Sequence, residues 1–426
     1  MLDAIHTVTT GNDPSCRLGS FQPYRVVIVG GSYAGLSAAL TLIALKEGRE
    51  MPFASHGNYA HLKHAPQVRN LNITILDQRD GFFHTVGAPL AHISPTHANS
   101  MWKQYTGFKE FMRPDLRFLQ GTATSINPTT QTLTYDDVHG MSQYQPYDYL
   151  LVSTGMQRKW PVTPKANSLL SYLKDASDYA DSIKVAGKLG VVIIGGGAVG
   201  VEFAGKIKSH YPNVKVILIH SRDQLLSNEP LPDEFKTRAL ELLQNEGVRV
   251  ILGQRVTADE LPDGTSYIKF LEGNQIHAGL VLMAVSKVSP ATSFVPSASL
   301  AKDKTILVDY RLRVMAGSSP SDTIFAAGDV VQWEGMKLGG SAMVMGNVAG
   351  ANIYSSVLSR ENICPPAMEE CPVTQPKMAL SIGDNAICFA GGDSEVQHGA
   401  DIGEAYFGSD MGWQRVLVGL GLWKHK

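Results

Sequence analysis

Three small residues near the start of the chain, Gly30, Ser32 and Gly35 in VVIVGGSYAGLSAAL, could support two different chemistries. Gly30-Gly31-Ser32-Tyr33-Ala34 is one residue short of the G-x-S-x-G nucleophile elbow, which exposes a catalytic serine on an α/β-hydrolase sheet. The same residues also fit a G-x-G-x-x-G dinucleotide turn in which serine replaces the second glycine. In such a turn the first glycine allows the bend, the second admits a pyrophosphate, and the third lets helix pack on strand.

A second stretch decides between the two interpretations. VVIIGGGAVGVEFAG places Gly195, Gly197 and Gly200 at the same spacing, and each copy lies between an apolar β-branched run and an alanine-containing helical pattern. Another apolar run, NITILD or KVILIH, follows each copy, whereas no HGGG-type oxyanion loop is present. We therefore predict two dinucleotide-binding βαβ units. The first binds a pyrophosphate at the start of its helix through Gly30, Gly31, Ser32, Tyr33, Ala34 and Gly35.

The residues that end the second strand of each unit differ. Asp77 in ITILDQRD is the acidic residue that normally holds the ribose hydroxyls, and Arg79 follows it in the predicted cofactor site. VILIHSRD instead ends with His220, Ser221 and Arg222 and has no carboxylate at the strand end. A cation and a hydroxyl there can accept a 2′-phosphate, so NADPH is at least as good a candidate as NADH. The alternative is that Arg222 simply lies on a surface loop.

The elements around these motifs predict an α/β fold with two Rossmann-like domains. We expect a flexible leader over 1–23, the first domain over 24–160 and 301–363, the second over 161–300, and a small C-terminal α+β unit over 364–426. Alternating runs predict a β-meander and return strand within 117–149, a polar helix within 165–188 and a strand in TILVDYRLRV. A glycine- and alanine-rich helix is expected over about 339–354.

Bulk properties exclude several classes of protein. Lys and Arg number 37 and Asp and Glu 39, for a net charge of −2, so nothing would attract nucleic acid. The four cysteines form no C-x-x-C, and His56, His61 and His64 fall in an apparent surface insertion, so we expect no metal site and no disulfide framework.

No secretion signal or run of about 20 apolar residues is present, which predicts a cytoplasmic protein. The segment GWQRVLVGLGLWKHK could lie on a membrane, or it could close the terminal unit.

These motifs in this order resemble the two-domain flavoproteins, and more narrowly the apoptosis-inducing-factor-like branch with the ferroptosis suppressor protein and type II NADH dehydrogenases. The resemblance runs from about Tyr24 to Ala351 through LDQRDGFFHTVGAPLA, YLLVSTG and TIFAAGDV, and the insertion before LNITILD is similar to fungal members. It implies a glutathione-reductase-like fold that binds FAD on the first domain and NADPH or NADH on the second.

The resemblance also assigns residues to FAD. Gly30 to Gly35 would hold its pyrophosphate and Asp77 its adenosine ribose, and the backbone of Ala123 would meet the adenine. Thr154 and Gly155 would line the crossing between the domains.

Three further residues are placed near the reacting rings. Asp329 would bind the ribityl chain, Glu202 would face the nicotinamide pocket, and Lys337 with the following helix N-terminus would stabilise charge on the flavin pyrimidine edge. The alternatives are a turn residue for Asp329 and solvent-exposed salt bridges for Glu202 and Lys337.

Three departures from the family pattern concern the same region. Leu90 stands where relatives can carry a basic residue, and VLMAVSKVSP places Ser286 where a glycine is usual. No cysteine pair lies in the flavin region, so a disulfide-reductase mechanism has no dithiol.

The expected mechanism is a hydride relay from NAD(P)H to the flavin and on to a quinone or similar small acceptor. His84 is a candidate proton donor, with a buried structural histidine as the alternative. A tailoring oxidoreductase for a secondary metabolite and a redox sensor with little turnover are the rival functions. A homodimer and peripheral membrane contact through the C-terminal segment are further expectations.

Overall fold

The computed structural model describes residues 22–52, 70–158, 160–285, 288–361 and 367–422. The first motif joins β1 (Tyr24–Val29) to α1 (Tyr33–Lys46). β1 pairs in parallel with β2 (Leu71–Asp77) on one side and with β8 (Tyr149–Val152) on the other. Val26 to Val29 are buried, as expected for a parallel strand covered on both faces. The turn after β1 therefore lies at the carboxyl edge of this sheet.

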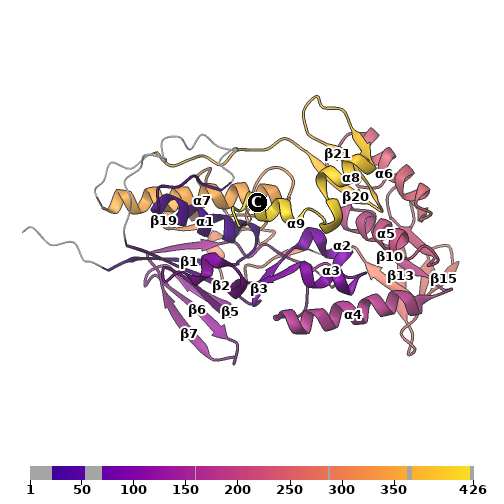
Figure 1. The fold of residues 1–426 in the computed structure, drawn as a ribbon, viewed down its shortest axis with the longest axis horizontal. Coiled ribbons are helices and arrows are strands. Elements are labelled where there is room, and N and C mark those ends of the chain that lie inside the picture. The colour runs from indigo at the N-terminus through magenta and orange to yellow at the C-terminus, as the bar shows by residue number, and fades with distance from the viewer. Residues whose placement is uncertain (1–21, 53–69, 159, 286–287, 362–366, 423–426) are drawn as a thin grey trace, which may run out of the picture.

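The first sheet has eight strands in the order β18-β19-β8-β1-β2-β5-β6-β7. Figure 1 shows β5, β6 and β7 on the side of the sheet away from α7 (Gly339–Arg360). The predicted meander is formed by β5 (Leu116–Asn127), β6 (Thr132–Asp137) and β7 (Ser142–Pro146), while β18 (Arg313–Ala316) and β19 (Ser319–Ala326) extend the other edge. TILVDYRLRV contributes only its end to β18, because Ile306 and Val308 form isolated bridges instead.

Helix α7 (Gly339–Arg360) packs along α1 over this sheet and is longer than the predicted 339–354 (Figure 1). Glycines allow the two helices to approach closely. A Cβ on Gly346 would lie 2.1 Å from the carbonyl oxygen of Ala34, and one on Gly350 would lie 2.8 Å from that of Ala38. This contact brings the N-terminus of α7 beside the first turn.

The second sheet is parallel, in the order β12-β11-β10-β16, and carries the second motif. The motif joins β10 (Val191–Ile194) to α5 (Ala198–His210), and the other strands are β11 (Val216–Ile219), β12 (Arg249–Ile251) and β16 (Leu280–Met283). Helices α4 (Leu169–Ala186) and α6 (Asp233–Asn245) contribute to its core, and an antiparallel sheet follows with β13 (Val256–Glu260), β14 (Ser266–Phe270) and β15 (Gln275–Ala278).

Two short strands pair where the chain crosses between the sheets. β9 (Met156–Gln157) runs antiparallel to β17 (Ser289–Pro290). Thr154 Oγ1 donates to the carbonyl of Ala291 at 2.8 Å, and the amide of Ala291 donates back to Gly155 at 3.1 Å. A neighbouring segment, with β3 (Gly81–Phe83), α2 (Ala88–Ala91), α3 (Pro95–Ser100) and β4 (Trp102–Gln104), contacts α5 through α2.

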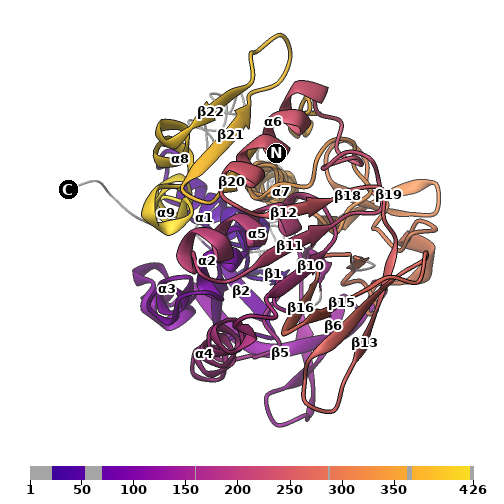
Figure 2. The same ribbon diagram turned by 90° about the vertical axis from the view of Figure 1, so that its right-hand side faces the viewer.

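The C-terminal residues divide their apolar side chains between the two cores. β20 (Met378–Ile382) and β21 (Asn385–Phe389) pack on α5 and α6, while β22 (Gln397–Gly399), α8 (Ala400–Tyr406) and α9 (Trp413–Gly419) follow (Figure 2). Trp413, Leu417 and Leu420 are buried in the core of the first domain. These three side chains pack in the protein interior, in keeping with the alternative in which the segment closes the fold, and peripheral membrane contact of the segment stays a prediction. Trp423 lies outside the described residues.

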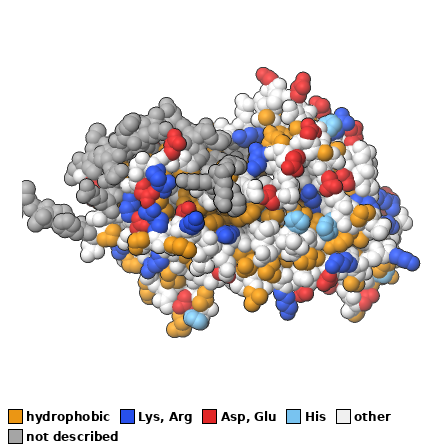
Figure 3. Space-filling model, viewed as in Figure 1, with side chains coloured by type: hydrophobic (Ala, Val, Ile, Leu, Met, Phe, Trp, Pro, Cys, Tyr) orange, Lys and Arg blue, Asp and Glu red, His pale blue; other side chains and the backbone are white. Residues whose placement is uncertain are grey.

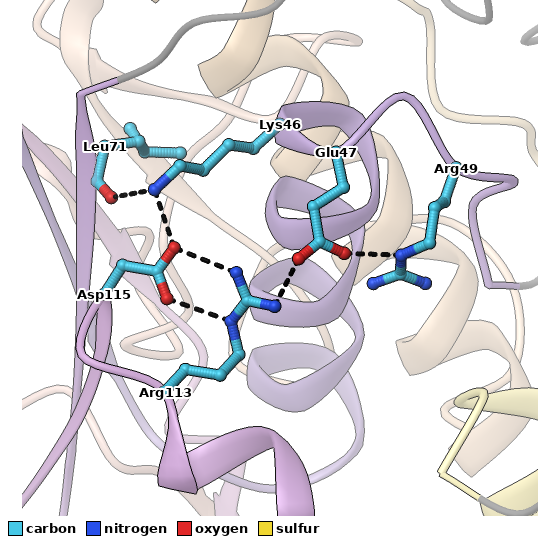
Figure 4. A network of polar contacts seen from close by, with 6 residues as sticks. All are labelled: Lys46, Glu47, Arg49, Leu71, Arg113 and Asp115. Atoms are coloured by element: carbon cyan, nitrogen blue, oxygen red, sulfur yellow. Dashed lines mark hydrogen bonds and ion pairs between the residues drawn. The ribbon is translucent and has the colours of Figure 1, made fainter.

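A polar network fixes the end of α1 to the first sheet (Figure 4). Lys46 Nζ donates to Asp115 Oδ2 at 2.6 Å and to the carbonyl of Leu71 at 3.1 Å, and Arg113 Nε donates to Asp115 Oδ1 at 2.9 Å. Arg113 also contacts Glu47, which accepts from Arg49. Elsewhere, charges of both signs are interspersed on the face drawn in Figure 3, in keeping with the small net charge. None of the described helices is long and apolar enough to cross a bilayer.

Candidate functional site

A cavity of about 1200 Å³ lies between the two dinucleotide turns and is large enough for a ligand bigger than most drugs. It brings together predicted site residues from both domains and from the crossing segment. These are Gly30, Ser32, Tyr33, Ala34, Asp77, Arg79, Ala123, Thr154, Gly155, Gly197, Glu202, Asp329 and Lys337. The cavity is not lined by Gly31, Gly35, His84, Gly195, Gly200, His220, Ser221 or Arg222.

The first turn is held by backbone contacts that leave its serine free. Gly30 has a φ of +101°, and a Cβ on Gly35 would lie only 1.8 Å from the Gly30 carbonyl oxygen. Ser32 is the N-cap of α1, yet its side chain makes no capping hydrogen bond. Its hydroxyl is therefore available to a ligand at the helix N-terminus, where an anion is favoured.

Asp77 and Arg79 form the end of the cavity beside β2. Asp77 Oδ2 accepts from the amide of Gly31 at 2.8 Å, and Oδ1 accepts from the amide of Arg79 at 2.9 Å. The buried Nε of Arg79 has no hydrogen-bond partner among the described residues. An unpaired buried guanidinium N–H is costly, so this end of the cavity suits an oxygen-rich or anionic ligand.

The second turn has the same geometry as the first. Gly200 is required for the packing of the turn, whereas Gly197 leaves room in the cavity. A Cβ on Gly200 would lie 1.9 Å from the carbonyl oxygen of Gly195, whose φ is +121°. A Cβ on Gly197 would meet nothing within 4 Å, although Gly197 lines the cavity. The absence of a side chain at 197 is thus not needed for packing and provides room for a ligand.

His220 supports this turn from the end of β11. Its Nδ1 accepts from the amide of Gly196 at 3.1 Å, so Nε2 carries the proton and donates to Ser227 Oγ at 3.2 Å. Burial and the nearby Arg222 lower the pKa of His220, so the ring is neutral. Ser221 and Arg222 are exposed just beyond the strand. Of the three residues predicted to accept a 2′-phosphate, the structure leaves the last two free to do so.

Asp329 and Lys337 flank the loop that leads into α7. Burial raises the pKa of Asp329, whose carboxylate has no hydrogen-bond partner in the described part of the chain. Lys337 Nζ donates to the backbone carbonyls of Asp329 and Val331, and burial lowers its pKa. Lys337 thus binds main-chain carbonyls, and within the described residues it makes none of the salt bridges that the sequence left open as the alternative.

Glu202 faces the cavity from the second turn of α5. Burial raises the pKa of its carboxyl to about 8, so it is mostly protonated at neutral pH. The amide of Ser381 donates to its Oε1 at 3.4 Å, whereas the nearby Lys206 donates to the carbonyl of Gly383 at 2.7 Å. The alternative of a solvent-exposed salt bridge therefore does not describe this glutamate.

His84 does not reach the cavity. Its Nε2 lies 2.9 Å from the carbonyl oxygen of Met411 and its Nδ1 lies 2.9 Å from the hydroxyl of Tyr33. Burial lowers its pKa to about 4. The expected role as a proton donor to an acceptor is therefore wrong, and the buried, hydrogen-bonded histidine given as its alternative is what the structure contains.

Some residues at the site have no sequence motif and were missed. Arg158 lines the cavity. Burial raises the pKa of Asp329 and that of Glu229, another lining residue, and the positive charge of Arg158 offsets part of both shifts. Only its position shortly after YLLVSTG could have indicated it. Five apolar residues that line the cavity belong to one hydrophobic cluster and are called its apolar wall: Trp160, Val162, Phe203, Met378 and Leu380. Glu202 adjoins this wall, because it precedes Phe203 and accepts from the amide of Ser381, which follows Leu380.

The structure describes two of the three departures from the family pattern, Leu90 and the cysteines of the flavin region. Leu90 is buried in the core of the second domain, while Ser286 lies outside the described residues. None of the described residues that line the cavity is a cysteine; Cys371 and Cys388 are buried elsewhere, and Cys16 and Cys364 are not described. The described residues contain no group of three metal-ligating side chains, and His56, His61 and His64 lie outside them.

Comparisons with known proteins agree with this architecture. Residues 24–346 match the family described as pyridine nucleotide-disulphide oxidoreductase. The chain is 38% identical over 412 residues to Oxidoreductase OXR1 of Ajellomyces capsulatus, covering 93% of this chain and 88% of that protein. Ferroptosis suppressor protein 1 of Homo sapiens is 28% identical over 79% of this chain and 82% of its own. The sulfide:quinone oxidoreductase of Aquifex aeolicus superposes with a TM-score of 0.65 at 16% identity, covering 93% and 92% of the two chains.

Proposed function

Because the chain belongs to the pyridine nucleotide-disulphide oxidoreductase family, we propose that it is an FAD-dependent NAD(P)H oxidoreductase whose acceptor is a quinone or a similar small molecule. The observation that carries this proposal is the shared cavity, which Ser32 of the first turn and Gly197 of the second both line. A hydride donor and a flavin bound by the two turns would meet inside it.

The residues beside β1 and β2 fit FAD. Gly30 and Ser32 line the cavity at the N-terminus of α1, where a pyrophosphate is favoured, and Arg79 offers its unpaired Nε to the same ligand. Asp329 presents a free carboxylate to hydroxyl groups of the ligand. FAD, when bound, supplies a reversible carrier of two electrons.

The charged groups of the cavity would assist electron transfer. Lys337 lies just before the N-terminus of α7, so both a cation and the helix dipole favour negative charge at this point of the wall. Glu202 holds a proton on its carboxyl at neutral pH and can give it to an acceptor that gains two electrons. The glutamate would be the proton donor in place of His84.

A quinone-like acceptor suits the apolar wall next to Glu202. Trp160, Val162, Phe203, Met378 and Leu380 offer planar and aliphatic surface, and a quinone ring is apolar except for its two carbonyl oxygens. No cysteine is found among the described residues of the cavity, so a disulfide acceptor has no dithiol there to exchange with. The acceptor of a structural neighbour is also a quinone, by the name of that enzyme.

Anaerobic titration of the purified protein with NADPH and NADH tests this function. The protein should be yellow, its flavin absorbance should bleach rapidly, and ubiquinone-1 or menadione should restore it in many turnovers. A colourless protein, or a flavin that neither coenzyme reduces, would contradict the proposal. Reduction without turnover of either quinone would favour the redox sensor, and turnover only with other organic acceptors would favour the tailoring enzyme.

A further inference from the structure

His84 lies between two segments that are far apart in the sequence. A carbonyl oxygen only accepts hydrogen bonds, so the 2.9 Å contact with Met411 requires the proton to sit on Nε2 of His84. In the neutral ring Nδ1 must then accept, and the hydroxyl of Tyr33 donates to it at 2.9 Å. The imidazole therefore accepts a hydrogen bond from Tyr33 and donates one to the carbonyl of Met411, and so links the two residues.

The Tyr33 end belongs to the first dinucleotide turn. Tyr33 is the first residue of α1, immediately after the N-cap Ser32, and its side chain lines the cavity. Its hydroxyl also accepts weakly from the amide of Val86 at 3.4 Å. The position of this ring thus shapes the wall beside the turn.

The Met411 end belongs to the start of α9. Met411 has a φ of +54°, and the carboxylate of Asp410 accepts from the amides of Gly412, Trp413 and Gln414 at 3.0 to 3.1 Å. This cap fixes the carbonyl of Met411 relative to the helix.

Aromatic packing reinforces the hydrogen bonds. The ring of Trp413 lies 5.1 Å from those of both His84 and Phe82, and Phe82 in turn lies 5.0 Å from Tyr33. A Cβ on Gly87 would lie 2.8 Å from Cδ2 of His84, so the imidazole also has little freedom on that side.

We propose that His84 is a positioning residue which, through Tyr33 and Met411, makes the C-terminal helix α9 a latch on the FAD-binding turn. Retention of the cofactor then depends on a segment that never enters the cavity. The inference rests on the proposed binding of FAD, and it goes beyond that function because it assigns a role to the C-terminus.

The experiment compares full-length variants at three positions. His84→Ala removes both hydrogen bonds, Tyr33→Phe removes one, and in His84→Gln the amide can donate and accept in the same sense as the imidazole. His92→Ala is the matched control, because His92 is equally buried and packs against Tyr172 and Tyr179 of the second domain's core. The dissociation constant of FAD is measured by flavin fluorescence, and hydrogen exchange is followed at residues 33–37 and 413–419.

Loss of the two bonds should weaken FAD binding roughly tenfold in His84→Ala and about threefold in Tyr33→Phe. In His84→Ala, exchange should accelerate at both segments, and added FAD should no longer protect α9. His84→Gln should recover most of the affinity, and His92→Ala should keep FAD protection of α9 even if it lowers Tm.

Wild-type affinity and exchange in His84→Ala would overturn the latch, as would equal loss of FAD protection in His92→Ala. A wild-type protein that binds no FAD would instead refute the proposed function. In that case the exchange of residues 33–37 and 413–419 without cofactor still tests the link, which fails if the two segments respond independently.

Discussion

His220 accepts the backbone amide of Gly196 with Nδ1 at 3.1 Å, in the same place in its βαβ unit where Asp77 accepts the amide of Gly31 at 2.8 Å. Asp77 is the last residue of β2, and His220 directly follows β11. Each side chain accepts a hydrogen bond from the residue after the first glycine of its turn. The second unit therefore keeps the structural contact of the acidic residue without its negative charge. This removes the repulsion that a carboxylate would exert on a 2′-phosphate.

Arg222→Ala should impair the use of NADPH selectively. The exposed guanidinium lies just beyond β11, and a charged hydrogen bond of about 1.5–3 kcal/mol predicts a rise of roughly tenfold or more in the KM for NADPH. The KM for NADH should change little. Arg249→Ala is the control, because this exposed arginine lies at the opposite end of the same sheet. An equal effect on the two coenzymes would argue against the phosphate site.

Gly197→Ala and Gly200→Ala should separate binding from folding. At 200 the added Cβ would clash with the Gly195 carbonyl at 1.9 Å, so we expect Tm to fall by several degrees. At 197 the added methyl meets only the cavity, so Tm should stay unchanged while the KM for NAD(P)H rises about tenfold. Thermal unfolding and steady-state kinetics distinguish the two effects. A stable Gly200→Ala protein would show that the turn can relax.

Glu202→Gln should alter both stability and the reoxidation step. The folded pKa of about 8 exceeds the ordinary 4.5, so the glutamate's contribution to stability is complete below pH 4.5 and is lost as the pH rises towards 8. The free energy of unfolding should fall by up to about 1.4 kcal/mol per pH unit in that window, and the amide should abolish this slope.

Glutamine cannot supply the proton, so in Glu202→Gln the oxidation of the reduced flavin by quinone should slow by about tenfold or more, with reduction by NAD(P)H preserved. Unchanged reoxidation would exclude Glu202 as the donor.

Asp115→Ala should destabilise the first domain. Asp115 joins Lys46 and Arg113, and its side chain is only 14% exposed (Figure 4). Removing it leaves Lys46 without its ion pair and Arg113 with Glu47 as its remaining ion-pair partner, which should cost about 2–3 kcal/mol in urea unfolding at pH 7. Hydrogen bonds from Arg113 lower the pKa of Asp115 to about 2, so the difference should shrink as the pH falls from 3.8 towards 2. Asp181→Ala, which breaks the exposed pair with Lys184, should cost less than about 0.5 kcal/mol.

The features that sequence could predict are local ones. The two turns follow from glycine spacing between β-branched and helical patterns, and both form as expected. The partners of His84 could not be foreseen, because Met411 lies 327 residues away and nothing in FFHT specifies a carbonyl. The spacing of Trp413, Leu417 and Leu420 specifies an apolar helix face, but a membrane and a protein core satisfy it equally well. Arg158 belongs to no motif, and the homodimer stays a prediction.

Ser32→Gly is the sharpest test of how the first turn works. Ser32 occupies the place that Gly197 fills in the second unit, and its hydroxyl makes no capping bond, so glycine should preserve Tm within about a degree. We expect FAD binding to weaken at most severalfold, through loss of one hydrogen bond to a phosphate, with turnover retained. Ser32→Val is the matched opposite change, because a branched side chain would fill the space at the start of α1 and should block FAD. Loss of all turnover in Ser32→Gly, with full flavin content, would instead show that the hydroxyl itself takes part in the chemistry.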